Sequence, residues 1–283
     1  MNEFGALPNG DVIARSALID AISALNNVSE TAFIVVGAQA VYLRTEQVQL
    51  RIPPYTLDGD IVADPRRVRR ARIISETLES ANFEIRGYEG LYHLSSADHA
   101  VRIATRIDVF VPARFENDWD INGYNQRDAR AVMSQAGLEI ALTDHSIMEL
   151  HGLNGDNRRV NVKVAGAVAL LIAKGWKIGE RYEKGPEEFQ KVGKDVADVY
   201  RLLLVHDAGE LSAALRRVPK EPRYSETIVK GTQYLKNLCT HGAPGLELLR
   251  QPRLFGDSEE ANQSIKRLGY LVEEFCGLVA ANG

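Results

Sequence analysis

Asp58 and Asp60 are the residues whose type and spacing most directly favour chemistry in this chain. They stand one residue apart in the segment Thr56-Leu57-Asp58-Gly59-Asp60-Ile61. Because side chains two apart in an extended strand point to the same face, we expect the two carboxylates side by side. Carboxylates that close repel each other, and a divalent cation such as Mg²⁺ or Mn²⁺ relieves the repulsion by taking oxygen ligands. Metal sites of this kind assist phosphoryl and nucleotidyl transfer.

Asp108 is a third acid that fits the same site. It stands in a run over residues 101–111 that alternates apolar and polar side chains, which predicts a half-buried strand. Arg106 shares its face and is expected either to neutralise the acids or to bind phosphate. If this strand pairs beside the Asp58/Asp60 strand, three carboxylates converge on one metal site. Asp108 is then the candidate to activate an attacking hydroxyl group.

The elements before Asp58 are expected to bind phosphate. Phe33–Val36 reads as a short buried strand, Gly37 as a sharp turn, and residues 38–43 as the start of a helix. The free N–H groups of a helix N-terminus attract anions. Gly37 and Ala38 are therefore candidate contacts for a nucleoside triphosphate.

A second group of charged residues lies in the latter half of the chain. Lys174 and Arg181 are seven apart in a predicted helix over residues 165–183, so they share a face. Asp195 and Asp198 follow in a predicted helix over residues 188–206, where Lys194 is spaced to pair with Asp198. One interpretation is an ordinary interhelical salt-bridge cluster. In the other, Lys174 contacts a triphosphate, while Asp195 orients Lys174 or takes part in proton transfer.

The remaining elements are predicted from periodicity and turn signals. We expect a helix that starts with Asp64 as N-cap and Pro65 at its first position, and a strand pair over residues 83–94. Short strands at 138–142 and 160–164 are expected to close the sheet. Further helices are expected at 11–27, 208–216, 225–239 and 258–280. We also expect a turn at Ile121-Asn122-Gly123 and a linker over Tyr182–Gly193.

The ordered set of motifs resembles the nucleotidyltransferase fold shared with DNA polymerase beta. It consists of an apolar strand, a glycine turn, a D-x-D strand and a third Asp on a later strand. The block that contains Lys174, Arg181 and Lys194-Asp195-Val196-Ala197-Asp198-Val199-Tyr200 resembles that of AbiEii-like toxins of type IV toxin–antitoxin systems, which include the MenT toxins. The glycine turn is Gly37-Ala38 here, where the family has Gly-Gly or Gly-Ser.

This resemblance implies a toxin that transfers nucleotides from a nucleoside triphosphate to RNA. The expected donor is CTP or another pyrimidine nucleotide, and the leading acceptor is the 3′ end of tRNA. It implies that Asp58, Asp60 and Asp108 hold Mg²⁺, that Lys174 and Asp195 are important for catalysis, and that Arg181 contacts the nucleotide. It further implies a cognate antitoxin as partner.

Composition limits the other possibilities. The chain has 34 Lys and Arg against 38 Asp and Glu, a mildly negative balance that argues against a general nucleic-acid coat protein. The dense cationic run over residues 66–72 is either a phosphate-binding patch or a solvated helix face. With two cysteines, no signal peptide and no apolar run near the ~20 residues of a membrane span, we expect a cytoplasmic protein that does not interact with membranes.

The predicted class is α/β (α+β), with a nucleotidyltransferase domain over residues 1–163 and a helical domain over 164–283. Two alternatives to the RNA-modifying enzyme stay open. One is a nucleotidyltransferase for a small molecule such as an antibiotic, which needs an enclosed pocket rather than a basic path. The other is a nucleotide- or partner-binding protein without turnover, which is favoured if Asp108 does not face Asp58 and Asp60.

Overall fold

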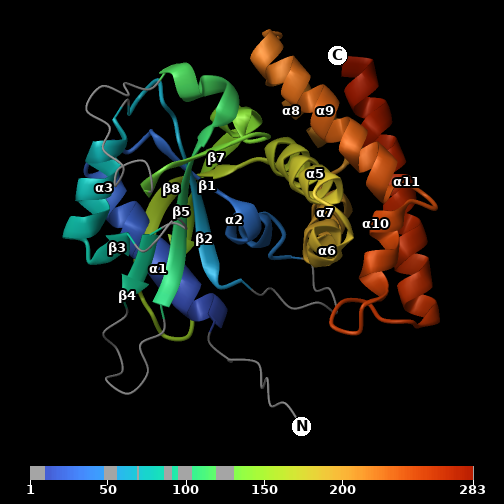
Figure 1. Ribbon diagram of the computed structural model, residues 1–283, viewed down its shortest axis with the longest axis horizontal. Helices are drawn as coiled ribbons and strands as arrows, with labels where there is room; N and C mark the ends of the chain where they lie inside the picture. Colours follow the sequence, from blue (N-terminus) through green and yellow to red (C-terminus); the bar gives the residue numbers. More distant parts are fainter. Residues whose placement is uncertain are drawn as a thin grey trace.

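The computed structural model describes residues 10–47, 56–68, 70–85, 91–94, 104–118 and 131–282. The predicted turn at Ile121-Asn122-Gly123 and the first three residues of the predicted 101–111 strand lie outside these ranges. The chain has the mixed α/β class expected from its sequence. A sheet occupies one part of the molecule, and helices from the second half of the chain stack beside it (Figure 1).

The sheet is mixed and is built around a short apolar strand. Strand β1 (Phe33–Val36) is buried along its whole length, as a continuous apolar run predicts for a central strand. It pairs antiparallel with β2 (Asp58–Ala63) and parallel with β8 (Arg159–Ala165). On its other edge, β2 pairs in parallel with β5 (Ala104–Pro112). The strand order along the sheet is β3 (Phe83–Ile85), β4 (Leu91–Leu94), β5, β2, β1, β8 and β7 (His145–His151), and β6 (Met133–Gln135) pairs with β5 off this path.

The sheet edges are formed by shorter or more exposed strands. Strands β3 (Phe83–Ile85) and β4 (Leu91–Leu94) form the predicted antiparallel pair, and β4 pairs with the first half of β5. Strand β6 (Met133–Gln135) pairs with the last residues of β5. At the opposite edge, β7 (His145–His151) pairs antiparallel with β8.

Helices cover both faces of the sheet. Helix α1 (Gly10–Asn26) packs against β2, β5 and β8 and also contacts α3 (Ala71–Ser80). Helix α2 (Gly37–Arg44) follows β1 directly and packs on β2, and it connects the sheet to α5 (Ala167–Glu183) and α7 (Gly193–Val205). Helices α8 (Ala208–Arg217), α9 (Pro222–Cys239) and α11 (Glu259–Asn282) form the outer layer (Figure 1).

One contiguous core joins the sheet to the helices. Its buried apolar side chains run from α1 and β1 through α5 and α7 to α11. The predicted domain boundary at residue 163 falls inside β8, two residues before that strand ends. Within the described ranges, no helix is both long enough and apolar enough to cross a bilayer.

Several local predictions differ from the structure. Residues 139–142 form the 3₁₀ helix η2 (Glu139–Leu142), not a strand, and their backbone bonds are local, from the N–H of Ala141 to the carbonyl of Leu138 and from the N–H of Thr143 to the carbonyl of Ile140. The strand that closes the sheet is β7, which the sequence did not indicate. The linker over Tyr182–Gly193 contains the short helices α6 (Pro186–Phe189) and η3 (Gln190–Val192).

The helix predicted from Asp64-Pro65 begins later, at Ala71. The backbone carbonyl of Asp64 accepts hydrogen bonds from the N–H groups of Arg67 and Val68, which makes a single turn. Its carboxylate accepts from the backbone N–H and the guanidinium of Arg66 instead of capping a helix. Ala71, Ile74 and Leu78 form the buried apolar stripe of α3.

A candidate metal centre in a cationic cleft

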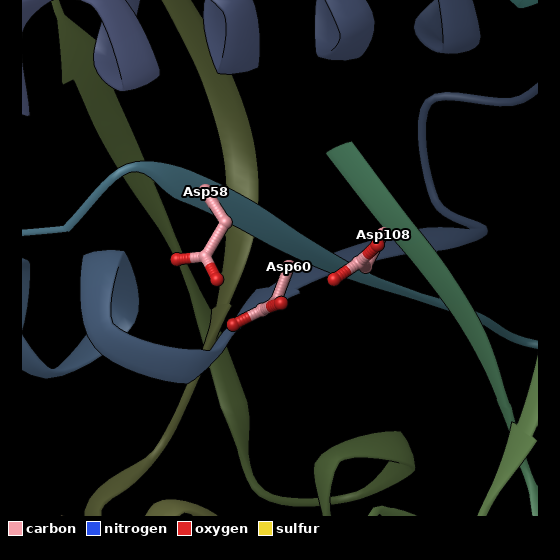
Figure 2. Close-up of side chains that lie close together, drawn as sticks. All are labelled: Asp58, Asp60 and Asp108. Carbon is pink, nitrogen blue, oxygen red and sulfur yellow. The ribbon is translucent and has the colours of Figure 1, made fainter. Parts of the chain in front are cut away.

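Asp58 and Asp60 project from the same face of β2. Gly59 lies on the opposite face, where an added Cβ would meet Ile107 of β5 and Leu18 of α1. The alternation of this strand therefore places its small and apolar residues against α1 and its two acids on the α2 side. Figure 2 shows both carboxylates on that side of the ribbon.

Asp108 joins them from β5. In the parallel pairing of β2 and β5, Asp60 stands opposite Asp108 and Asp58 stands opposite Arg106. One carboxylate oxygen from each of the three acids lies within 4.8 Å of the others. Figure 2 shows the Asp108 carboxylate directed toward that of Asp60. We call these three residues the acid triad; their predicted convergence is confirmed.

Two neighbours hold the triad in place. The hydroxyl of the buried Thr56 donates a hydrogen bond to Oδ1 of Asp58. The guanidinium of Arg106 lies 2.9 Å from Oδ2 of Asp108 and 3.6 Å from Oδ2 of Asp58. Arg106 thus offsets part of the negative charge of the triad, and Lys177 and Lys174 across the cleft also lower the pKa of Asp60.

The crowding of negative charge in the triad raises the pKa values of two of its acids. Burial, followed by the charge of Asp60, raises the pKa of Asp108 to about 7 against the attraction of Arg106. Burial, followed by the charge of Asp58, raises the pKa of Asp60 to about 6. Because the two carboxylates lie so close together, the protonation of one depends on that of the other, and the two pKa values describe the pair.

Gly37 is required by its close approach to the triad. Its φ is +64°, in the left-handed region that favours glycine. A Cβ at this position would lie 1.8 Å from Oδ2 of Asp60. The backbone at the start of α2 therefore runs directly beside the acids. Ala38 follows in the first turn of the helix with its side chain buried, so it offers a ligand only its backbone N–H.

The residues present fit a divalent metal ion. The triad supplies carboxylate oxygens, which hard cations such as Mg²⁺ prefer, and two ligands of one Mg²⁺ lie roughly 3–4 Å apart. Oδ1 of Asp108 is buried and has no hydrogen-bond partner among the described residues. A buried carboxylate oxygen without a partner is costly, and a metal ion would satisfy it.

The triad lines one side of a cleft of about 370 Å³, and a cationic stripe lines the other. The stripe consists of Lys174, Lys177 and Arg181 of α5 and of Lys184, which directly follows this helix. Their spacing of three, four and three keeps them on one face. Lys177 and Lys184 were not predicted, although this spacing is visible in the sequence. Glu180 is the acid of α5 that also lines the cleft.

Lys174 is the buried end of this stripe. Its Nζ donates to Oδ1 of Asp195 at 2.6 Å and to Oδ2 of Asp198 at 2.7 Å, both on α7. We call these three residues the lysine clamp. The predicted contact between Lys174 and Asp195 is present, so the interpretation as a salt-bridge cluster is correct for Lys174, Asp195 and Asp198, whereas Arg181 pairs elsewhere. Lys174 also lines the cleft, which the catalytic interpretation requires.

The charges of the lysine clamp are paired more completely than those of the acid triad. Burial lowers the pKa of Lys174, but Asp195 and Asp198 outweigh this effect and raise it above its ordinary value. Burial raises the pKa of Asp195, but Lys174 and Lys177 outweigh it and hold that pKa well below its usual range. Asp195 itself does not line the cleft, so it acts on any ligand through the two lysines.

Other predicted contacts are arranged differently. The predicted Lys194–Asp198 pair is absent: Asp198 bonds to Lys174, and the Nζ of Lys194 lies over the ring of Tyr42, 5.8 Å from its centroid. Arg181 lines the cleft as expected and forms an ion pair with Glu188 of α6. In the 66–72 run, Arg66 and Arg67 pair with Asp64 and Arg72 pairs with Glu76.

Comparisons of this chain with protein-family models, with curated proteins and with solved structures give no match.

Proposed function

We propose that this protein is a Mg²⁺-dependent nucleotidyltransferase that moves a nucleotide from a nucleoside triphosphate to a hydroxyl group of RNA. The observation that carries the proposal is the acid triad facing the cationic stripe across one cleft. The triad suits the metal, and the stripe suits the phosphates. Nucleotidyl transfer needs both, because negative charge develops on phosphate oxygens as the bond to pyrophosphate breaks.

Each part of the cleft then has a role in the reaction. Asp58, Asp60 and Asp108 would hold Mg²⁺, which supplies charge stabilisation at the α-phosphate. The acceptor hydroxyl bonds to the α-phosphorus, the bond to the β-phosphate oxygen breaks, and pyrophosphate leaves. Asp108 would take the hydroxyl proton through the carboxylate oxygen that does not bind the metal. Lys177 and the backbone N–H groups at Gly37 and Ala38 contact the triphosphate.

The clamp explains how Lys174 and Asp195 contribute. The ammonium of Lys174 has three N–H donors, of which two bond to Asp195 and Asp198, so one remains for the cleft. Asp195 also lies 3.2 Å from Lys177, whose side chain is 53 % exposed. We therefore assign Asp195 the role of a positioning residue that orients both lysines toward the phosphates.

The extent of the cationic stripe favours a polymeric acceptor over a small molecule. At 1.5 Å per residue, Lys174 and Lys184 are about 15 Å apart along α5. Lys184 is thus too far along the helix to contact the phosphate next to Lys174, and it suits a second anionic group. We propose an RNA 3′ end as that group, with the acceptor end of tRNA first. Toxicity through blocked translation, and restraint by an antitoxin, belong to the same proposal.

The test is nucleotide transfer by purified protein. Total RNA, a tRNA fraction and a small-molecule hydroxyl pool are each incubated with Mg²⁺ and one of four α-labelled nucleoside triphosphates. We expect label in RNA, loss of activity with EDTA, and recovery with Mn²⁺. Asp60→Asn should lower the rate by on the order of 10³-fold. The matched control is Asp118→Asn, which removes an exposed ion pair with Arg223.

Label on a small molecule and not on RNA would reject the RNA acceptor but keep the reaction class. Full transfer by Asp60→Asn would reject the metal centre. No transfer to any acceptor, with tight metal-dependent nucleotide binding, would favour a nucleotide-binding protein without turnover.

A further inference from the structure

Arg106 forms a cross-strand square with the acid triad. It stands two residues before Asp108 on β5, so both side chains leave the same face of that strand. The register places it opposite Asp58, just as Asp108 stands opposite Asp60. Three corners of the square are carboxylates and the fourth is a guanidinium. The strand register therefore places the guanidinium of Arg106 beside the proposed metal site.

The contacts of Arg106 use two of the carboxylates that a metal would need. Its Nη2 lies 2.9 Å from Oδ2 of Asp108 and 3.6 Å from Oδ2 of Asp58, so one nitrogen bridges two acids of the triad. A carboxylate cannot give its full charge to a guanidinium and to a metal ion at once, even when the metal binds its other oxygen. A metal ion bound to these carboxylates would also repel the positively charged guanidinium of Arg106. Binding of the metal and this position of Arg106 therefore oppose each other.

The guanidinium of Arg106 has a second possible position within the same cleft. Its side chain is 37 % exposed and lines the same cleft as Lys177 and Arg181. A guanidinium is a planar fork of N–H donors, and it binds phosphate oxygens in pairs. Released from the acids, it stays within the cleft, where phosphates of a nucleotide would lie.

We propose that Arg106 is a resident counter-ion that a divalent metal displaces from Asp58 and Asp108, and that the released guanidinium then binds the triphosphate. The proposal rests on the metal centre of the proposed function. Before metal arrives, Arg106 stabilises the crowded acids. After the metal binds, the guanidinium of Arg106 is released from the acids and can bind phosphate. Metal and nucleotide consequently favour each other's binding, beyond the metal's own contact with phosphate.

The experiment measures two affinities with separate probes. Mn²⁺ binding is followed by electron paramagnetic resonance without nucleotide, and binding of inorganic triphosphate is followed by calorimetry at saturating Mg²⁺. Arg106→Gln should bind Mn²⁺ about tenfold more tightly, because a competing charge is gone. The same variant should bind triphosphate with Mg²⁺ several-fold more weakly. Arg106→Lys should bind Mn²⁺ with an intermediate affinity, because an ammonium keeps the charge without the fork.

The control is Arg159→Gln. Arg159 also projects from a strand of the sheet and makes a 2.9 Å ion pair, but with Glu149 and away from the triad. Its loss should change neither affinity. Circular dichroism melts establish that each variant is folded.

Unchanged or weaker Mn²⁺ binding by folded Arg106→Gln and Arg106→Lys would overturn the proposal. Tighter Mn²⁺ binding with unchanged triphosphate binding would overturn the transfer of Arg106 to phosphate. The metal centre fails separately: in that case the wild-type protein binds no Mn²⁺, or binds it equally well with Asp60→Asn.

Discussion

The acid triad and Lys174 of the lysine clamp line the same cleft, yet the two clusters differ in how their charges are paired. The triad brings three carboxylates within 4.8 Å of one another with one bridging guanidinium. The clamp surrounds the ammonium of Lys174 with two carboxylates at 2.6 and 2.7 Å. The clamp is buried, whereas the side chains of Asp58 and Arg106 at the triad are 36 % and 37 % exposed. Only the clamp pairs its charges fully, so removing one partner should destabilise the clamp, whereas removing one acid should relieve repulsion in the triad.

This difference in charge pairing indicates that the acid triad is a binding site and that the lysine clamp is a structural support. A site that must accept a metal cannot be satisfied without it, since a satisfied site would compete with its own ligand. A support must be satisfied, since its side chains have to stay in place while ligands exchange. The free energy of unfolding of variants is therefore the most direct way to test the contrast.

The largest expected effect is a loss of stability in Lys174→Met. Removing this ammonium leaves Asp195 and Asp198 buried without their shared partner, at a cost of about 3–5 kcal/mol. Asp108→Asn should cost nothing, because it removes one of three clustered like charges. Urea unfolding without metal measures both. The double variant Lys174→Met/Asp195→Asn should recover part of the loss. If Lys174→Met lies within about 1 kcal/mol of wild type, the clamp is not a support.

The next effect separates backbone strain from the close approach at the triad. Gly37 and Gly155 both have positive φ, +64° and +87°, so alanine at either should cost roughly 1–2 kcal/mol. A Cβ at Gly37 also meets the Asp60 carboxylate, whereas nothing lies within 4 Å of a Cβ at Gly155. Gly37→Ala should therefore lose more than about tenfold in Mn²⁺ affinity, and Gly155→Ala should lose none. Equal affinities in the two variants would contradict the close approach.

A smaller effect is the pH dependence of stability. Folding raises the pKa values of Asp60 and Asp108 to about 6 and 7, above their unfolded value near 4. The stability that these groups contribute is therefore fully present below about pH 4, and it is lost as pH rises through 6 and 7. The melting advantage of Asp108→Asn over wild type should grow by a few degrees between pH 4 and 8 without metal. Added Mg²⁺ should remove most of it.

The clamp should behave differently in the same window. The folded-state pKa of Asp195 is depressed, so its contribution is present above its unfolded pKa and is lost only as pH falls toward the folded value. Asp195→Asn should lose a constant amount of stability from pH 5 to 8. A trend parallel to that of Asp108→Asn would mean that the two clusters titrate together and that the contrast fails.

The triad could be predicted because local patterns determine it. A D-x-D spacing fixes the shared face of Asp58 and Asp60, and the alternation around Asp108 fixes its parity. The continuous apolar run of β1 and the long amphipathic helices α5, α7 and α11 are similarly local signals. Which strand lies beside which was supplied by the family resemblance, since spacing alone does not specify sheet order.

The failures have equally specific causes. Strand β7 is an edge strand with Ile147 71 % exposed, so little of its pattern marks a buried face. Asp64 has the sequence context of a helix cap, but Arg66 takes its carboxylate. For Arg106 the sequence did predict that it could neutralise the acids, and only the detail was missing: the pairing of Asp58 with Arg106 shows that one guanidinium reaches two of them. Pairing between distant segments is not encoded in any short window of sequence.

The smallest expected effect divides the cationic stripe into two halves. Lys177 pairs with Asp195 at 3.2 Å and stands next to the clamp, whereas Lys184 lies seven residues, or roughly 10 Å, further along α5. If the stripe serves the triphosphate at one end and the acceptor at the other, Lys177→Gln should raise KM for the nucleotide. Lys184→Gln should raise KM for RNA. Both side chains are solvated, so each effect should be about three- to tenfold. Steady-state transfer with each substrate varied in turn measures the two constants, and Lys266→Gln on the exposed side of α11 is the control. If both variants raise KM for the nucleotide alone, the stripe serves one ligand. The argument for a polymeric acceptor would then be lost, while the contrast between triad and clamp would stand.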